Sequence, residues 1–498
     1  MVFPQCHPGR TSSQRDRIRE RHVPSLPDPR PPPHGQAAVL GPIASATSTA
    51  RQTGDCDVRS ERPRLSVIGT GYLGATHAVC MVELGYDVIG LDIDEAKIER
   101  LRAGEIPFFE PGLPELLAKH IDGGRLRFTT SYPEVAEFAD VHFVCVGTPQ
   151  RKGELAADMT YVDAAFSSLA PHLTRKVLVV GKSTVPAGTA ARMESLLLDL
   201  APNKDVELAW NPEFLREGFA VEDTLRPDRL VFGVHSAWAE QQLRAAFAPV
   251  LETGTPAVVT DFATAELVKV AANSFLATKI SFINAMAEVC EVTGADVTKL
   301  AEAIGHDARI GRRFLNAGLG FGGGCLPKDI RAFIARAGEL GVDQAVSFLR
   351  EVDEINLRRR VRTVEIGLDL VDGSYHGTHV AVLGAAFKPN SDDVRDSPAL
   401  DVAASIGRRG GTVVIYDPHA MQNARRMHPE LTYVESLIEA VTGADVIMLL
   451  TEWDEFRAMS PERIGALVAH RNLVDGRNVL DPVQWRAAGW LYRALGRP

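Results

Sequence analysis

Residues 65–74 read Leu-Ser-Val-Ile-Gly69-Thr-Gly71-Tyr72-Leu73-Gly74, an apolar run that leads into a glycine-rich turn. Residues 75–84 follow with a helical pattern, so the turn connects a predicted strand to a predicted helix. Gly69 permits a tight turn, Gly71 lets backbone N–H groups approach a pyrophosphate, and Gly74 allows the helix to pack closely on the strand. The segment therefore predicts the opening of a doubly wound α/β domain.

The next predicted strand, residues 87–91, ends at Asp92. A carboxylate at this position can accept hydrogen bonds from both hydroxyls of an adenosine ribose, and its charge would repel a 2′-phosphate. We therefore expect a dinucleotide site that prefers NAD to NADP. The alternative is a strand, turn and helix that bind no ligand. The combination of the glycine turn, its flanking strand and helix, and Asp92 after the next strand disfavours this alternative.

Apolar runs alternate with helical patterns farther along the chain, at residues 141–146 and 177–180 and again from residue 379. Such alternation is typical of parallel sheets with helices on both faces. Residues 261–304 and 329–370, which lie between, have long helical patterns. The predicted fold class is α/β, with two doubly wound Rossmann-like domains joined by a central helical region. The expected boundaries are 1–62 for a tail and 63–260, 261–372 and 373–498 for the folded regions.

The first 62 residues differ in composition from the rest. Proline dominates residues 23–35, and residues 44–54 are small and polar. We expect this tail to be disordered and dispensable, because such a composition cannot bury a core. The tail also lacks the apolar stretch of a signal peptide. An equally simple interpretation is that translation starts later than residue 1.

Composition and charge exclude several classes of function. Of the 498 residues, 45% are hydrophobic and 24% are charged, as in globular proteins with several domains. A formal net charge of −10 argues against nucleic acid and anionic membranes as partners. No stretch is apolar enough to span a bilayer. The 6 cysteines are scattered, without metal-ligand spacing, which favours a reducing cytoplasm and no metal site.

A cysteine stands in the second glycine-rich segment, residues 320–329, which read Gly-Phe-Gly-Gly-Gly-Cys325-Leu-Pro327-Lys328-Asp329. Three consecutive glycines indicate backbone that closely approaches a ligand. Pro327 is typical of a first helical turn, so we expect Cys325 just before a helix N-terminus, where Lys328 would help to lower the thiol pKa. This arrangement favours a nucleophile. From the spacing alone, a small buried cysteine is an equal alternative.

Two further segments pair polar side chains at helical spacing. Glu213 and Glu217 would share a face if their segment is helical. Such pairs usually lie on a solvated surface, but the apolar residues around them favour a site. Lys269 and Asn273 would share a helical face amid alanine, valine and leucine. A lysine in that setting either extends to solvent or is held for function.

Residues 387–398 follow the first strand of the second α/β region, where such sheets present ligands. The segment lacks the glycine pattern of the first region, so we expect it to hold a ligand other than a second dinucleotide. Lys388, Arg395 and the upstream Arg309 would supply positive charge to phosphates.

Together these segments resemble those of the UDP-glucose/GDP-mannose 6-dehydrogenase family, from Leu65 to about residue 480. The resemblance rests on the glycine turn and on Phe109-Glu-Pro-Gly-Leu113, Val146-Gly-Thr-Pro149, Lys182-Ser-Thr-Val-Pro186, Asn211–Glu217, Pro227-Asp-Arg229, Glu266–Asn273, Phe321–Asp329 and Phe387–Pro398. One departure lies beside the cysteine. There the family's commoner G-G-S-C-F run has glycine at position 324 and leucine at position 326.

The resemblance implies an N-terminal NAD-binding domain, a central helical dimerisation region with the catalytic cysteine, and a C-terminal domain that binds a nucleotide sugar. It implies NAD-dependent four-electron oxidation at C6 of the sugar, through a thiohemiacetal and a thioester on Cys325. UDP-glucose is favoured over GDP-mannose and UDP-N-acetylhexosamines. The other classes are a nucleotide-sugar-binding paralogue without activity and a two-electron hydroxyacid or sugar-phosphate dehydrogenase, which would not use a cysteine in a loop.

The family's site residues carry over to matching positions of this chain. Lys269 and Asn273 would stabilise the oxyanion. Asp329 with Thr184 would position or deprotonate water, and Glu213 would be the base for thioester hydrolysis. Cofactor contacts are expected from Gly69, Gly71, Tyr72, Leu73, Gly74, Asp92, Lys97, Thr148, Thr184, Glu217, Lys328 and Arg395. Substrate contacts are expected from Glu213, Phe214, Leu215, Lys269, Asn273, Arg309, Phe321, Gly322, Phe387 and Lys388, with Arg309 reaching a neighbouring subunit of a homodimer or larger homo-oligomer.

Overall fold

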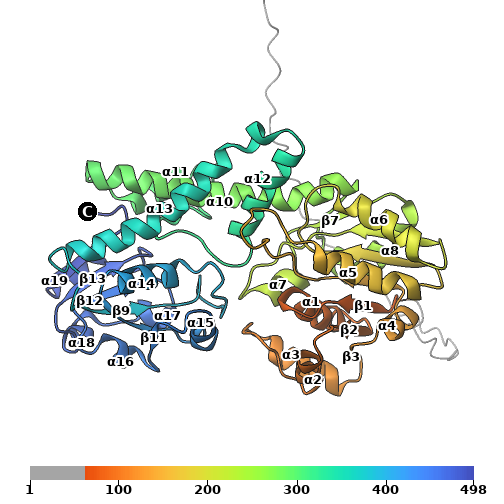
Figure 1. Ribbon diagram of the computed structural model, residues 1–498, viewed down its shortest axis with the longest axis horizontal. Coiled ribbons are helices and arrows are strands. Elements are labelled where there is room, and N and C mark those ends of the chain that lie inside the picture. The colour runs from red at the N-terminus through yellow and green to blue at the C-terminus, as the bar shows by residue number, and fades with distance from the viewer. Residues whose placement is uncertain (1–61) are drawn as a thin grey trace, which may run out of the picture. The chain divides into compact units, whose positions relative to one another are not determined.

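The computed structural model describes residues 62–498. The expected disorder of the tail concerns residues 1–62 and therefore falls, except for Arg62, outside the described residues. Within the described part the chain forms two sheets and, between them in sequence, a set of long helices (Figure 1).

The first sheet has eight strands in the order β3-β2-β1-β4-β5-β6-β7-β8. Its strands are β1 (Leu65–Ile68), β2 (Val88–Leu91), β3 (Leu126–Thr129), β4 (Val141–Val144), β5 (Val177–Gly181), β6 (Val206–Trp210), β7 (Leu230–Val234) and β8 (Ala257–Thr260). The order of the first six is that of a doubly wound sheet, which confirms the predicted fold class. One pair of neighbouring strands in this otherwise parallel sheet is antiparallel, β6 with β7. Residues 211–229 join these two strands and contain one short helix, α7 (Ala220–Leu225).

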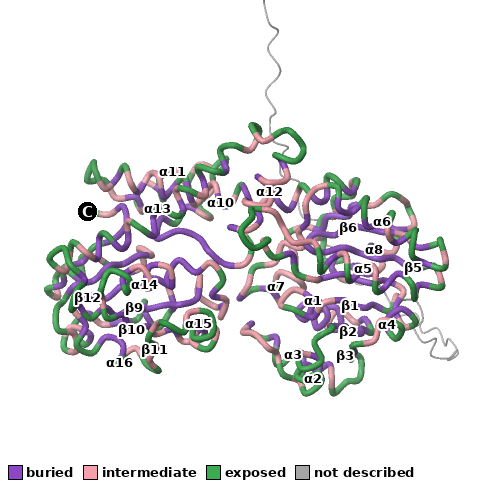
Figure 2. The backbone as a smooth tube through the Cα atoms, in the orientation of Figure 1, coloured by how far each residue is buried: buried purple, intermediate pink, exposed green. Residues whose placement is uncertain are grey.

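Helices cover both faces of this sheet. They are α1 (Tyr72–Glu83), α2 (Glu95–Arg102), α3 (Leu113–Asp122), α4 (Tyr132–Phe138), α5 (Thr160–Leu169), η2 (Ala170–His172), α6 (Thr189–Leu200), α7 (Ala220–Leu225), α8 (Ala237–Ala246) and α9 (Ala248–Glu252). One hydrophobic core joins the sheet to α1, α3 and α8, and a second core joins it to α4, α5 and α6. Figure 2 shows the strands between these helices as buried. The two cores thus hold the strands rigidly, and the loops that could form a site begin at the carboxyl ends of these strands.

The central region consists of α10 (Phe262–Thr293), α11 (Val297–Gly305), α12 (Leu326–Glu339), η3 (Asp343–Val346) and α13 (Phe348–Asp369). The side chain of Asp261 caps α10 by accepting a hydrogen bond from the N–H of Thr264. The predicted helix over residues 261–304 is interrupted at Gly294, which ends α10 in the left-handed conformation. Helix α10 packs against both α12 and α13. This packing fixes the start of α12, where Cys325 stands.

The second sheet has six parallel strands in the order β11-β10-β9-β12-β13-β14. Its elements are β9 (His379–Leu383), α14 (Pro398–Arg408), β10 (Thr412–Tyr416), α15 (Met421–Met427), β11 (Thr432–Tyr433), α16 (Leu437–Val441), β12 (Val446–Leu449), α17 (Asp454–Arg457), α18 (Pro461–Gly465), β13 (Asn472–Asp475), α19 (Pro482–Ala487) and β14 (Leu491–Ala494). This order repeats that of the first six strands of the N-terminal sheet. The second doubly wound domain is therefore confirmed.

Among residues 62–498, no helix is both long enough and apolar enough to cross a membrane.

Candidate active site

Cys325 stands at the start of helix α12. It is the N-cap residue, Leu326 begins the helix, and Pro327 lies in the first turn, as the sequence predicts. The residue is exposed, whereas the other three cysteines of the described part, Cys80, Cys145 and Cys290, are buried. Cys325 is thus the exposed cysteine of this part of the chain, although protein surrounds most of its thiol group.

The expected lowering of the thiol pKa is wrong for this structure. Desolvation by the surrounding protein, together with the negative charges of Asp329 and Glu213, raises the pKa of Cys325 to about 12. The positive charges of Lys269 and Lys328 lower it by less. The thiol is therefore protonated near neutral pH before any ligand binds.

We expect iodoacetamide to label Cys325 at pH 7 about tenfold or more slowly than it labels an unstructured cysteine, because only the thiolate reacts. The labelling rate should still be rising above pH 10. Mass spectrometry of the labelled peptide measures this rate, and the Cys325→Ser variant identifies the signal. A rate that reaches its plateau below pH 9 would contradict the raised pKa.

A buried ion pair connects two of the predicted catalytic residues. The Nζ atom of Lys269, on α10, lies 3.0 Å from Oε1 of Glu213, and Glu213 also accepts the N–H of Leu215 at 2.8 Å. Burial alone would lower the pKa of Lys269, but the charges of Glu213 and Asp329 and the hydrogen bond to Glu213 outweigh this effect and raise it. Lys269 therefore stays positively charged, as an oxyanion partner must.

A second contact joins α10 to α12. Nδ2 of Asn273 donates to Oδ2 of Asp329 at 2.6 Å, and the ammonium of Lys328 pairs with the other carboxylate oxygen. Asn273 is one helical turn from Lys269 on α10, and Asp329 is one turn from Cys325 on α12. The structure thus brings the predicted catalytic groups of both helices together.

The segment with the two glutamates is a loop and not a helix. Residues 211–216 have no regular structure, and α7 begins only at Ala220, so Glu213 and Glu217 do not share a helical face. Pro212 removes a backbone donor, which disfavours a helix at this place. The ring of Phe214 is covered by the guanidinium of Arg229, whose Cζ lies 3.8 Å from the ring centre. Arg229 belongs to the Pro227-Asp-Arg229 motif.

Glu217 points toward the C-terminal domain. One of its carboxylate oxygens lies 3.3 Å from the guanidinium of Arg395, and the other accepts the hydroxyl of Ser391 at 3.0 Å. Lys388 donates to the backbone carbonyl of Glu217 at 2.6 Å. Burial and the nearby charge of Asp393 raise the pKa of Glu217 to about 7. The two predicted basic residues of segment 387–398 are therefore at the site.

The guanidinium of Arg395 packs directly on the glycine run. A Cβ added at Gly324 would lie only 2.2 Å from Cζ of Arg395, and one at Gly323 would lie 2.7 Å from the ring of Phe387. A side chain at position 324 would therefore require the guanidinium of Arg395 to move away from the glycine run. Gly322 is similarly close to the carbonyl oxygen of Asp396.

The glycine turn of the first domain fits a dinucleotide. A Cβ at Gly74 would lie 1.8 Å from the carbonyl oxygen of Gly69, so helix and strand pack as closely as predicted. Gly71 is the N-cap of α1, and a Cβ there would meet nothing within 4 Å. The space beside Gly71 is therefore open at the start of this helix, where a pyrophosphate would bind.

Asp92 lies at the end of β2, next to this turn. Its Oδ2 accepts the N–H of Thr70 at 2.9 Å and pairs with Nζ of Lys97 at 2.9 Å. Although burial opposes it, these contacts lower the pKa of Asp92. The carboxylate is therefore ionised and held at the place expected for the adenosine ribose.

Asp92→Ala should raise the KM for NAD about tenfold, because two hydrogen bonds to the ribose are lost. The preference for NAD over NADP should narrow, since the charge that repels a 2′-phosphate disappears and Lys97 is left unpaired. Steady-state rates with both cofactors measure this change. Asp87→Ala, at an exposed ion pair with Arg125, is the control. Equal use of NADP by the unaltered protein would contradict the role given to Asp92.

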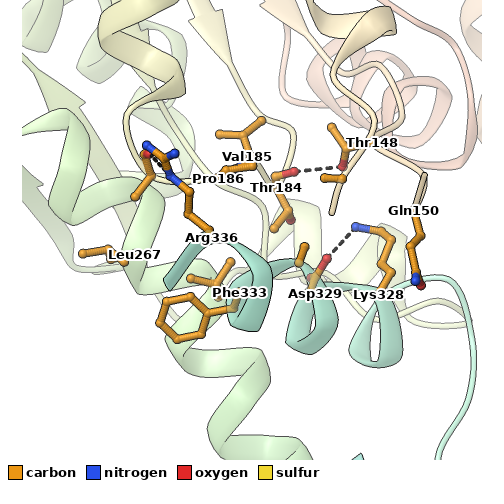
Figure 3. A pocket seen from close by; sticks show the side chains of 14 residues that line it. Thr148, Gln150, Thr184, Val185, Pro186, Leu267, Lys328, Asp329, Phe333 and Arg336 are labelled. Atoms are coloured by element: carbon orange, nitrogen blue, oxygen red, sulfur yellow. Dashed lines mark hydrogen bonds and ion pairs between the residues drawn. The ribbon is translucent and has the colours of Figure 1, made fainter. Parts of the chain in front are cut away.

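A pocket lies between the loops after β4 and β5 and helices α10 and α12 (Figure 3). Thr148 and Thr184 stand together on one side of it, where the hydroxyl of Thr148 donates to the carbonyl of Thr184 at 2.8 Å. Lys328 and Asp329 stand on the other side (Figure 3). The pocket gathers four predicted site residues from two domains.

Some predicted residues lie elsewhere or have other partners. Arg309 is exposed and paired with Asp307 at 2.6 Å, away from the cluster within its own chain. The ring of Phe321 belongs to a buried core with Ala277 and Ile330. The hydroxyl of Tyr72 donates to the buried carboxylate of Glu110. Their predicted contacts with substrate and cofactor stay predictions.

Sequence reasoning missed Arg477, which follows β13. Its guanidinium donates to the carbonyls of Gly320 at 3.0 Å and Phe387 at 3.1 Å, and it pairs with Glu452 at 3.2 Å. It thereby connects the loop before Cys325 with segment 387–398. The position directly after a short apolar strand was a signal that could have identified it.

Comparison with known families matches three consecutive parts of the chain. They are the NAD binding domain of the UDP-glucose/GDP-mannose dehydrogenase family at residues 63–251, its central domain at 263–358 and its UDP binding domain at 381–482. The chain belongs to this family. The predicted family, the oxidoreductase class and the cofactor NAD are thereby confirmed.

Individual members of the UDP-glucose/GDP-mannose dehydrogenase family are similar over most of the chain. The UDP-glucose 6-dehydrogenase of Rhizobium meliloti is 41% identical over 87% of this chain and 100% of its own length. A UDP-glucose dehydrogenase structure from Pyrobaculum islandicum is 38% identical, with a TM-score of 0.82 over 89% of this chain and 100% of that one. A UDP-D-ManNAc dehydrogenase structure from Pyrococcus horikoshii is 28% identical, with a TM-score of 0.76 over 87% and 99%.

Proposed function

We propose that the chain oxidises UDP-glucose to UDP-glucuronate with two molecules of NAD. The observation that carries this proposal is the thiol of Cys325 beside the Lys269–Glu213 ion pair and the Asn273–Asp329 hydrogen bond. Oxidation of an alcohol to an acid passes through an aldehyde, which a thiol can hold covalently. A two-electron dehydrogenase would not need that group. The similarity to UDP-glucose 6-dehydrogenases supports the choice of sugar.

The first oxidation converts the C6 alcohol to an aldehyde. Bound NAD accepts a hydride in each of the two oxidation steps. The proton of O6 passes to water while a hydride leaves C6, so negative charge develops on that oxygen. The ammonium of Lys269 and the amide of Asn273 stabilise this charge in a buried setting where competing water is scarce. The raised pKa of Lys269 keeps it charged throughout.

The thiol of Cys325 then adds to the aldehyde, with its proton passing to the carbonyl oxygen, and gives a thiohemiacetal. Its pKa of about 12 means that the proton is present at the start of this step. A second hydride leaves C6 while the hydroxyl proton passes to water, and the thiohemiacetal becomes a thioester. Water, deprotonated by Glu213 and positioned by Asp329 with Thr184, adds to the thioester and releases the carboxylate and the thiol.

The proposal is tested by following NADH with UDP-glucose, GDP-mannose and the UDP-N-acetylhexosamines as separate substrates. We expect two NADH per UDP-glucose and the highest kcat/KM for that sugar. If GDP-mannose or an N-acetyl sugar had the highest kcat/KM, the proposed substrate would be wrong and the proposed mechanism would stand. One NADH per sugar would contradict the thioester, and no NADH with any of them would point to a binding protein without activity.

We further propose a homodimer in the cytoplasm, with Arg309 directed at the partner's substrate. Helix α10 presents Phe275, Phe282 and Val289 at intervals of seven residues, and these are 66%, 49% and 51% exposed. An apolar stripe of this kind on a long helix supports association with a second copy.

The free cysteines of the described part support a reducing compartment.

Phe282→Glu should convert the dimer to monomers, because it places a charge in the centre of this stripe. Light scattering after size exclusion measures the mass. Val483→Glu changes a residue of α19 that is 74% exposed, and it should leave the mass unaltered. An unchanged mass for Phe282→Glu would show that the stripe is not the interface.

A further inference from the structure

The motif Phe109-Glu110-Pro-Gly-Leu113 has no part in the chemistry described above, yet its glutamate is buried beside the site. Glu110 is 2% exposed and lies in the loop before α3. A carboxylate so far from water is stable only if hydrogen-bond donors surround it. The partners of Glu110 therefore indicate what the motif does.

All the donors to Glu110 come from two segments of the NAD-binding domain. The backbone N–H of Gly218 donates to Oε2 at 2.7 Å, and the N–H of Ala220 donates to Oε1 at 2.7 Å. The hydroxyl of Tyr72 donates to Oε2. Each carboxylate oxygen thus has its own backbone donor. Glu110 acts as the cap of α7, whose own N-cap residue, Phe219, has no side chain that can do so.

The loop that Glu110 holds is the loop of the two site glutamates. Gly218 directly follows Glu217 and has a φ of 79°, and a Cβ there would lie 2.4 Å from the carbonyl oxygen of Asn390. Lys388 contacts the same loop through the carbonyl of Glu217. The carboxylate of Glu110 therefore holds in place the loop that segment 387–398 contacts.

The third donor connects this carboxylate to the cofactor turn. Tyr72 is the first residue of α1, directly after Gly71, so its hydroxyl reaches Glu110 from the helix start that faces the dinucleotide site. Burial and the charge of Glu110 raise the pKa of Tyr72 above its usual range, so the phenol remains a proton donor at every pH at which the protein works. The ring of Tyr72 also packs on Phe108, 4.7 Å between ring centres.

We propose that Glu110 is a positioning residue that fixes the loop of Glu213 and Glu217 for catalysis, and that Tyr72 orients Glu110 from the cofactor turn. The inference rests on the proposed function, because it assigns that loop to sugar oxidation. A carboxylate is required at position 110. Glutamine would turn an N–H donor toward one of the two backbone N–H groups, and aspartate is too short to reach both.

Two variants and one control test the proposal, first without any ligand. Glu110→Gln should speed hydrogen–deuterium exchange of peptides over residues 213–220 about tenfold, and Tyr72→Phe should do so by a smaller factor. Tyr492→Phe is the matched control. This change also removes a buried tyrosine hydroxyl that donates to a carboxylate. The hydroxyl of Tyr492 donates to Oδ2 of Asp475, in the C-terminal domain, at 2.8 Å. The control variant should leave exchange over 213–220 unchanged.

The second measurement is steady-state kinetics with UDP-glucose. Glu110→Gln should lower kcat about tenfold to a hundredfold and raise the KM for the sugar, while the dissociation constant for NAD changes less than about twofold. A mere loss of folded protein would lower the rate and leave the KM for the sugar unchanged. Exchange over 213–220 that stays as in the unaltered protein, or an unchanged KM for the sugar, overturns the proposal. If the unaltered protein does not oxidise UDP-glucose, the proposed function fails, and the exchange measurement still decides the role of Glu110.

Discussion

Replacing Cys325 with serine is expected to stop steady formation of NADH from UDP-glucose. Serine is close in size to cysteine, so the start of α12 and the binding of the sugar should be preserved. The hydroxyl has a far higher pKa than the thiol, and an ester would be hydrolysed more slowly than a thioester. The first hydride transfer does not need the thiol. The variant should therefore make at most about one NADH per site before it stalls.

A single-turnover NADH trace, with mass analysis of protein and sugar, measures this outcome. Cys290→Ser is the control, because Cys290 is a buried thiol of α10 in a separate small core. It should turn over as the unaltered protein does. Sustained formation of the uronic acid by Cys325→Ser would contradict a covalent mechanism. The oxidation would then have to proceed through a hydrated aldehyde activated by Asp329.

Lys269→Met should lower kcat by about 10²–10³, because it removes the positive charge that stabilises the developing oxyanion. The thermal stability should also fall, since the carboxylate of Glu213 keeps only 13% of its side-chain surface exposed and would lose its partner. Lys269→Arg should not restore the rate. The longer, planar guanidinium does not fit a position that is 5% exposed between α10 and the loop of Glu213.

The measurement is kcat at saturating UDP-glucose and NAD, with the folded fraction determined by thermal unfolding. Lys299→Met is the control, because that lysine is exposed on α11 and pairs with Glu302 at 3.0 Å. If Lys269→Met kept a kcat within about threefold of the unaltered protein, electrostatic stabilisation by Lys269 would be excluded.

Most of the fold follows from local patterns in the sequence. The strand before Gly69 is found as predicted, and the predicted strands at residues 87–91 and 177–180 are found within one residue of those bounds. Their signals are short apolar runs with a turn or helix pattern on each side, which depend on near neighbours alone. The helix start at Cys325 is likewise a local property of Pro327.

The features that sequence reasoning missed depend on residues far apart in the chain. Glu110 binds an N–H that is 108 residues away, and no spacing rule connects the two. The raised pKa of Cys325 arises from desolvation and from the charges of Asp329 and Glu213, which together outweigh the opposing charges of Lys269 and Lys328. The antiparallel pairing of β7 with β6 likewise joins two segments that are separated in the sequence by residues 211–229.

The two sheets have separate hydrophobic cores, so the two α/β domains can fold separately before the active site is complete. Parallel strands join only through long crossovers, so each domain has many contacts between distant residues and should fold slowly. Domains of large chains tend to fold as units, in the order of their synthesis. The thiol loop touches Arg395 and Phe387, which are synthesised after it. In refolding from denaturant, helical circular dichroism should therefore return before catalytic competence does.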